Sequence, residues 1–294
     1  MDHAKTIAMA TDLLAQGRAE DVVQMVDPLL TPRDDASRST GRMLLRGLRA
    51  QVEVLHRDQP ARALDLLPSL PDLSDRCTCV RAEVALWRGW AHARVRSDVA
   101  ETTRAVRLLD QAEDLFDSIH DPRGRCWSML GRAQAYFALG EYALMRCELN
   151  EASALTQQLN DQQAERWRHT LSIPALRAEG RYDEAEEHLH ALQALGRRWN
   201  DRRIRGTATA HEAALRHELG QSPADVIETA ETAEALLRQS EARASAALLT
   251  AYHAHVGALF RQGEWSDAQA VLDEAQSAVR DDAAGQARVT ILRI

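Results

Sequence analysis

Hydrophobic residues recur every three or four positions through most of the chain, which is the spacing of one face of an α-helix. The clearest stretch is 121–161, where one such segment ends at Gly140 and a second begins at Tyr142. Glycine after the last apolar residue is a usual stop signal, because it adopts left-handed backbone at low cost. This stretch therefore predicts two helices joined by a tight turn.

The same landmarks return every 40 residues. Three registers carry the repeat: Trp87, Trp127 and Trp167; Gly140, Gly180 and Gly220; Leu115, Leu155 and Leu195. Acidic residues open the units at Asp121, Asp161, Asp201, Glu241 and Asp281. The hairpin breaks, at Gly17, Asp58, Asp98, Gly140, Gly180, Gly220 and Gly263, lie 40 to 43 residues apart. A fixed period with two helices in each unit predicts an α-solenoid.

The chain in order predicts about seven helix hairpins. The predicted pairs are 4–15 with 19–30, 38–56 with 61–67, 74–96 with 99–116, 122–139 with 141–158, 162–179 with 182–195, 202–219 with 223–238, and 242–262 with 265–279. Ser97 or Asp98 is the expected cap where one turn lacks glycine. Pro174 inside a predicted helix indicates a kink, interpreted either as static or as a hinge.

Residues 281–294 resemble the first helix of an eighth hairpin and end at Ile294 without a glycine or polar cap. We therefore expect residues 1–294 to be the N-terminal part of a longer protein. No linker or shift in composition interrupts the repeats, so we expect a single domain over 1–294.

The repeats resemble the tetratricopeptide repeat family. The matching residues are Ala133, Tyr136, Gly140, Tyr142 and Ala152; Gly180, Tyr182, Ala185 and Leu189; and Phe260, Gly263, Trp265, Ala268, Leu272 and Ala275. Each unit is about six residues longer than the usual pattern, as in the longer variants of bacterial signalling and regulatory proteins. The resemblance implies an all-α, right-handed superhelix with a concave groove that binds a protein or peptide.

Net charge and composition limit the kinds of partner that the chain is expected to bind. The net charge of −8 disfavours direct nucleic-acid binding, which needs basic residues against phosphates. No apolar run approaches the roughly 20 residues of a membrane span, and the N-terminus lacks the pattern of a signal peptide. We therefore expect a cytoplasmic protein.

The four cysteines are too few for a disulfide framework in a chain of this length. On a helix, the side chains of Cys77 and Cys79 would point about 200° apart. The expectation is of reduced, mostly packed thiols.

Nine residues of the first helices are candidates to line the groove: Trp87, Trp90, Arg94, Trp127, Gln134, Phe137, Trp167, Arg177 and His217. The tryptophan column would hold an extended peptide or partner helix, and the alternative is that its rings pack between neighbouring units. Arg94 and Arg177 would pair with carboxylates of a bound chain, unless they are ordinary solvated charges.

Nothing in the sequence indicates catalysis. The His188/His190 and His253/His255 pairs diverge on a helix, and no phosphate-binding loop or nucleophile motif is present. We expect no enzyme activity, metal or cofactor.

Two functions stay open: a peptide-binding scaffold, and a ligand or signal-peptide sensor that controls an attached output domain such as a nucleotide cyclase or a DNA-binding domain. Self-association through terminal hairpins is a further possibility.

Overall fold

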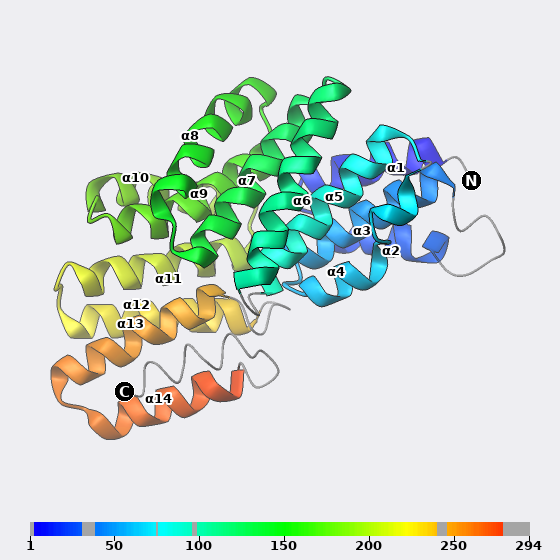
Figure 1. Cartoon of the computed structure of the whole chain (residues 1–294). Coiled ribbons are helices and arrows are strands. Elements are labelled where there is room, and N and C mark those ends of the chain that lie inside the picture. Colours follow the sequence, from blue (N-terminus) through cyan, green and yellow to red (C-terminus); the bar gives the residue numbers. More distant parts are fainter. Residues whose placement is uncertain (1–2, 31–38, 75, 96–98, 240–245, 279–294) are drawn as a thin grey trace. The chain divides into compact units, whose positions relative to one another are not determined.

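The computed structural model describes residues 3–30, 39–74, 76–95, 99–239 and 246–278, and these form α-helices with no strand (Figure 1). The helices are α1 (His3–Ala15), α2 (Ala19–Leu30), α3 (Thr40–Leu55), α4 (Pro60–Leu66), α5 (Thr78–Val95), α6 (Val99–Ser118), α7 (Pro122–Leu139), α8 (Tyr142–Leu159), α9 (Gln162–Ala178), α10 (Tyr182–Arg198), α11 (Arg202–Glu218), α12 (Pro223–Arg238), α13 (Ala246–Gln262) and α14 (Trp265–Ala278). The chain divides into two compact units, Met1–Leu171 and Ser172–Ile294.

Two kinds of residue end one helix and start the next. Asp121 accepts hydrogen bonds at its Oδ1 from the backbone N–H groups of Arg123 and Gly124, at 3.0 and 3.1 Å. This is an N-cap, which satisfies amides that the first helical turn leaves unpaired. At the other end of α7, Gly140 has φ 76°, in the left-handed region that glycine adopts without strain.

The same punctuation recurs along the chain. Gly17, Gly180, Gly220 and Gly263 also have φ between 70° and 80°. At the opposite ends of the hairpins, His120, Asn160 and Asn200 adopt left-handed backbone 40 residues apart. Each of these three residues directly precedes an aspartate, Asp121, Asp161 or Asp201. The 40-residue period in the sequence therefore reflects turns that recur every 40 residues.

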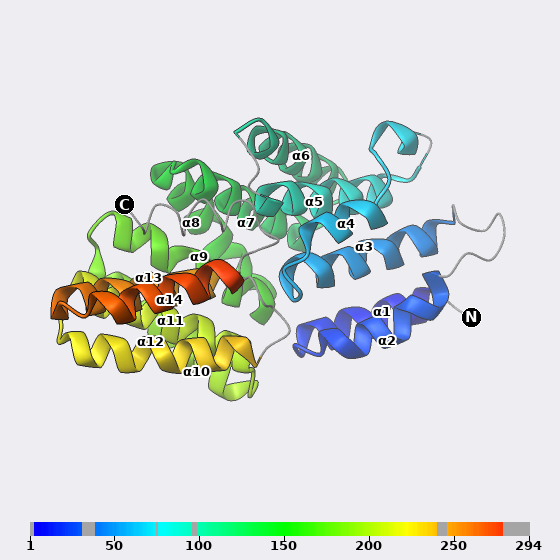
Figure 2. The ribbon, with the colours of Figure 1, turned by 90° about the horizontal axis from the view of Figure 1, so that it is seen from below.

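In the unit Met1–Leu171, each first helix packs against its own partner and against the next first helix. The first helices α1, α3, α5 and α7 contact one another in order, and α2, α4 and α6 also contact the first helix that follows them (Figure 2). Small residues permit close approach: a Cβ added to Gly124 on α7 would lie 2.2 Å from the ring of Phe116 on α6. These are stacked antiparallel hairpins.

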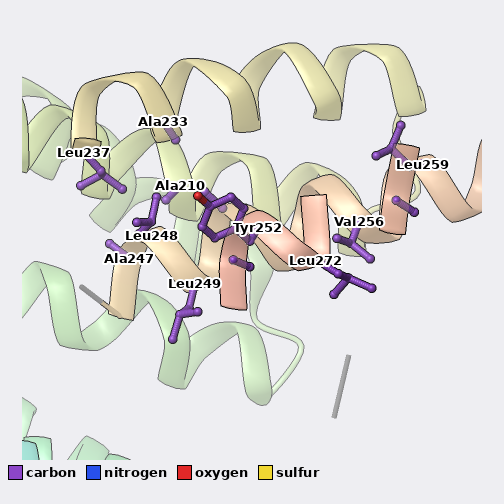
Figure 3. Close-up of a cluster of buried hydrophobic side chains, with 13 residues drawn as sticks. Ala210, Ala233, Leu237, Ala247, Leu248, Leu249, Tyr252, Val256, Leu259 and Leu272 are labelled. Atoms are coloured by element: carbon purple, nitrogen blue, oxygen red, sulfur yellow. The ribbon is translucent and has the colours of Figure 1, made fainter. Parts of the chain in front are cut away.

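In the unit Ser172–Ile294, helices α11, α12, α13 and α14 contribute to a core around Tyr252 (Figure 3). Its members are mostly alanine and leucine, including Ala233, Leu237, Leu248 and Leu272. The Tyr252 hydroxyl accepts a hydrogen bond from Arg238 Nη2 at 3.0 Å. The one polar atom of the large buried ring is thereby satisfied, as burial of a tyrosine requires.

The predicted all-α hairpin fold is confirmed in the described residues. Within the described ranges, two boundaries differ by three residues or more. Helix α5 starts at Thr78 rather than 74, because Pro71–Leu73 forms a separate 3-10 turn, and α10 ends at Arg198 rather than 195. Helix α9 runs through Pro174, and the kink, the hinge and the single domain stay predictions. The proposed caps Ser97 and Asp98, the unit markers Glu241 and Asp281, and the eighth helix lie outside the described residues. None of the described helices has the length and apolar character of a membrane span.

Asp161 should be worth more to stability than the matching cap Asp201. Its Oδ1 caps α9, and its Oδ2 accepts from Arg123 Nε at 2.9 Å and Trp127 Nε1 at 3.2 Å. We expect Asp161→Ala to lower the free energy of unfolding by about 2–4 kcal/mol, since it removes a cap and unpairs a buried indole. Asp201→Ala should cost about 1 kcal/mol. Urea denaturation of both variants measures the difference, and equal losses would contradict it.

Candidate functional site

Four tryptophans from three first helices form one cluster in the unit Met1–Leu171. The Trp87 and Trp90 rings of α5 lie 5.8 and 6.0 Å from the ring of Trp127 on α7. The Trp90 ring also lies 5.4 Å from that of Trp167 on α9, in an edge-on arrangement that aromatic pairs favour. We call Trp87, Trp90, Trp127 and Trp167 the tryptophan cluster.

The side chains of the tryptophan cluster are buried in the protein and are not exposed on its surface. Its four side chains are at most 6% exposed. Trp90 Nε1 donates to the backbone carbonyl of Trp127 at 2.9 Å, and Trp87 Nε1 donates to Glu83 at 2.8 Å. The rings therefore pack between neighbouring hairpins, which was the alternative to an open aromatic ladder. The reason is that small residues on the first helices let each large ring reach the next helix.

Trp167 differs from the other members of the cluster. Its Nε1 is buried and has no hydrogen-bond partner among the described residues. Two guanidinium groups lie over its ring, with Cζ of Arg94 at 5.3 Å and Cζ of Arg166 at 4.8 Å from the centroid. Cation–π contacts of this kind stabilise by about 0.5–2 kcal/mol. Arg94 is also ion-paired with Asp58, which follows α3.

Two amide side chains on the same helices are buried with atoms unpaired. Gln134 on α7 is 2% exposed, and its Nε2 has no partner in the described part of the chain. Gln163 on α9 is 4% exposed, and its Oε1 is unpaired within the same ranges. A Cβ added to Gly17, in the α1–α2 turn, would lie 3.7 Å from Gln163 Nε2. The turn of the first hairpin thus lies beside the start of α9.

Phe137 lies near the C-terminal end of α7, three residues after Gln134. Its half-buried ring contacts that of Tyr142 across the α7–α8 turn, with centroids 6.4 Å apart. The same pair recurs as Phe260 and Trp265 at the α13–α14 turn, 5.1 Å apart. Phe137 therefore contributes to closing a hairpin.

The other two candidates, Arg177 and His217, lie in the unit Ser172–Ile294. Arg177 makes a two-point ion pair with Glu218, at 3.0 Å from Nε and 2.5 Å from Nη2. The His217 ring lies 6.3 Å from that of His253. Burial, then the charge of Arg261, lowers the pKa of His217, and burial, then the charge of Arg177, lowers that of His253.

A third histidine in this unit, His211, lies on α11. Full burial, with a smaller contribution from the charge of Arg177, lowers its pKa to about 3. The imidazole is therefore neutral in the folded protein near neutral pH. Arg177 is not an ordinary solvated charge, since its side chain is 11% exposed and paired.

Several residues at these sites were not predicted from the sequence. Gln163, Arg166, Asp58, His211 and His253 were not expected to take part. Gln163 had a signal, because it stands four residues before Trp167, as Glu83 stands before Trp87. The other positions depend on which neighbouring helix faces them. No group of three or more histidine, cysteine or carboxylate side chains that could hold a metal occurs among the described residues.

No protein-family model and no curated protein matches the sequence. Solved structures do share the fold. NprR in complex with its cognate peptide NprX has a TM-score of 0.72 at 12% identity, over 99% of this chain and 82% of NprR. A Rap protein complexed with Competence and Sporulation Factor has a TM-score of 0.69 at 11% identity, over 99% and 80%.

The apo form of the quorum sensor NprR from B. thuringiensis has a TM-score of 0.65 at 12% identity, over 99% of this chain and 80% of that one. At such low identity the likeness concerns the fold alone. This chain has the helical-repeat fold of these proteins.

The buried imidazole of His211 should make stability fall as the solution becomes acidic. Its folded-state pKa of about 3 lies below the value near 6.5 of an unfolded histidine, so only the unfolded chain takes up this proton. Stability is then complete above about pH 6.5 and is lost as the pH falls from there towards 3. We expect the slope to approach about 1.4 kcal/mol per pH unit.

His211→Leu should remove that contribution between about pH 6.5 and 5, as followed by urea denaturation at each pH. His190→Leu is the exposed control on α10 and should keep the wild-type slope. A wild-type slope in the His211 variant would contradict the assignment.

Proposed function

We propose that this chain is a non-catalytic regulatory protein that binds a short linear peptide on the first-helix face of the unit Met1–Leu171. By first-helix face we mean the sides of α5, α7 and α9 that carry the tryptophan cluster, Gln134 and Gln163. We also propose that the repeats are of the long tetratricopeptide type. The fold of the NprR–NprX complex supports a peptide as the partner.

The observation that carries the proposal is the set of unpaired buried atoms on this face. Gln134 Nε2, Gln163 Oε1 and Trp167 Nε1 provide donors and an acceptor that the described residues leave unused. A buried group without its hydrogen bond costs about 1–3 kcal/mol, so a ligand that supplies the missing partners would be stabilised on this face. A peptide backbone supplies a carbonyl and an N–H at every residue, which matches donors and acceptors together.

The surroundings suit recognition of an uncharged peptide backbone. The guanidinium of Arg94, which lies over the Trp167 ring, is already neutralised by Asp58. Recognition would therefore rest on hydrogen bonding more than on net charge. In many peptide-binding sites, hydrogen bonds to the main chain of the peptide provide affinity, and pockets for its side chains provide specificity.

The test is selection from a pool of short linear peptides with randomised positions, followed by calorimetry with the enriched sequences. Gln134→Met and Gln163→Met remove the amides at nearly constant volume. We expect each to weaken binding about tenfold, equivalent to about 1.4 kcal/mol, because the peptide loses a hydrogen bond. Gln158→Met, on the exposed side of α8, should bind as the wild type does.

The same variants separate a binding role from a structural one. Because Gln134 Nε2 has no partner in the described ranges, Gln134→Met should leave the free energy of unfolding unchanged or raise it. A variant that loses stability and keeps peptide affinity would show a structural amide. Failure of the pool to yield any binder would overturn the proposal.

A further inference from the structure

Two thiols lie in contact at the start of α5. The Sγ atoms of Cys77 and Cys79 are 3.0 Å apart. The expectation that their side chains diverge is wrong, because Cys77 is not yet part of the helix. Its carbonyl accepts the first helical hydrogen bonds, from Val80 and Arg81 at 3.1 and 3.2 Å, so it holds the N-cap position. Freed from helical geometry, its side chain turns back over Cys79.

The pair is also accessible. Cys77 is exposed and Cys79 is half-buried, whereas Cys126 is buried in the core. The expectation of mostly packed thiols is therefore wrong for this pair and for Cys147, which is exposed on α8. Accessible neighbouring thiols are the arrangement found in sulfur sites that react.

The surroundings make the two sulfur atoms unequal. Partial burial acts to raise the pKa of Cys77, but hydrogen bonds from the Cys79 thiol, the Val80 N–H and the Thr40 hydroxyl outweigh it and lower the pKa. Burial raises the pKa of Cys79 to about 11, and the neighbouring Cys77 adds to the rise. Cys77 is thus the better nucleophile, and Cys79 is the sulfur that keeps its proton.

We propose that Cys77 and Cys79 form a reversible oxidation site, in which Cys77 reacts with a hydroperoxide and Cys79 then closes an intramolecular disulfide. With hydrogen peroxide, the Cys77 thiolate attacks one oxygen, an S–O bond forms, and the O–O bond breaks. The leaving hydroxide takes up a proton and becomes water. Cys77 is then a sulfenic acid.

In the second step the Cys79 sulfur attacks the Cys77 sulfur. The S–S bond forms, the S–O bond breaks, and hydroxide leaves with the thiol proton as a second water. Overall the pair loses two hydrogen atoms and the peroxide is reduced to two waters. The sulfur atoms need to approach by only about 1 Å, from 3.0 Å to the bond length of about 2.05 Å. A dithiol reductant reverses the step by exchange.

Oxidation would also alter a contact between hairpins. Thr40 is the first residue of α3, and its hydroxyl helps to lower the pKa of Cys77 at the start of α5. A disulfide sulfur is a weaker acceptor than a thiolate, so this link between α3 and α5 weakens on oxidation. The site lies on different residues from the proposed peptide-binding face and does not depend on it.

The experiment treats the reduced full chain with hydrogen peroxide and maps tryptic peptides by mass. Trypsin releases 77–81, 126–132 and 147–166 separately, so each thiol group is read in its own peptide. We expect peptide 77–81 to lose the mass of two hydrogen atoms before Cys147 reacts, and to regain it with dithiothreitol. The protein should lose two of its four thiols at this stage.

Single-cysteine variants separate the roles of the thiols, with helical circular dichroism as the check on folding. Cys147→Ser should leave the reaction of peptide 77–81 unchanged. Cys79→Ser should abolish the internal disulfide and leave Cys77 as a sulfenic acid that dimedone captures. Oxidation of Cys147 ahead of the pair, or conversion of Cys77 to a sulfinic acid while Cys79 keeps its thiol, would overturn the proposal.

Discussion

Within each compact unit, the structure depends on neighbouring helix hairpins burying one another's apolar faces. A single pair of helices exposes too much apolar surface to be stable, and stacking removes that surface from water. In the unit Met1–Leu171 the link is visible at Asp161. One carboxylate caps α9 and also holds Arg123 and Trp127 of the preceding hairpin. Turn geometry and packing between hairpins are thereby joined in one residue.

The first-helix face carries three buried polar atoms that have no partner among the described residues: Gln134 Nε2, Gln163 Oε1 and Trp167 Nε1. Trp87 and Trp127 have partners for their indole N–H groups, and Trp167, in the same register, has none among the described residues. Trp87 donates to Glu83, four residues before it, and the residue in the matching position before Trp167 is Gln163. A repeat array can vary one position in one unit without disturbing its neighbours, since stability is shared between nearest neighbours.

Two titratable groups on the first helices differ in the partners that they have among the described residues. Arg132 on α7 lies between Glu113, Glu148 and Asp110, and these ion pairs join α6, α7 and α8. His211 in the second unit is buried without a partner for Nδ1 in the described part. The first group strengthens contact between hairpins, and the second makes stability depend on proton concentration. Both lie on first helices, where burial is greatest.

The sequence by itself determined the helices, their turns and the period. These depend on local interactions: the aspartate caps of Asp121, Asp161 and Asp201 act within three residues, and the glycine turns need only their own backbone. The tertiary structure decided which rings are buried, which amides lack partners, and that Arg94 pairs with Asp58. It also decided that the thiols of Cys77 and Cys79 meet. Such contacts follow from how one helix is placed against another, and from where a helix begins to within one residue, which periodicity does not specify.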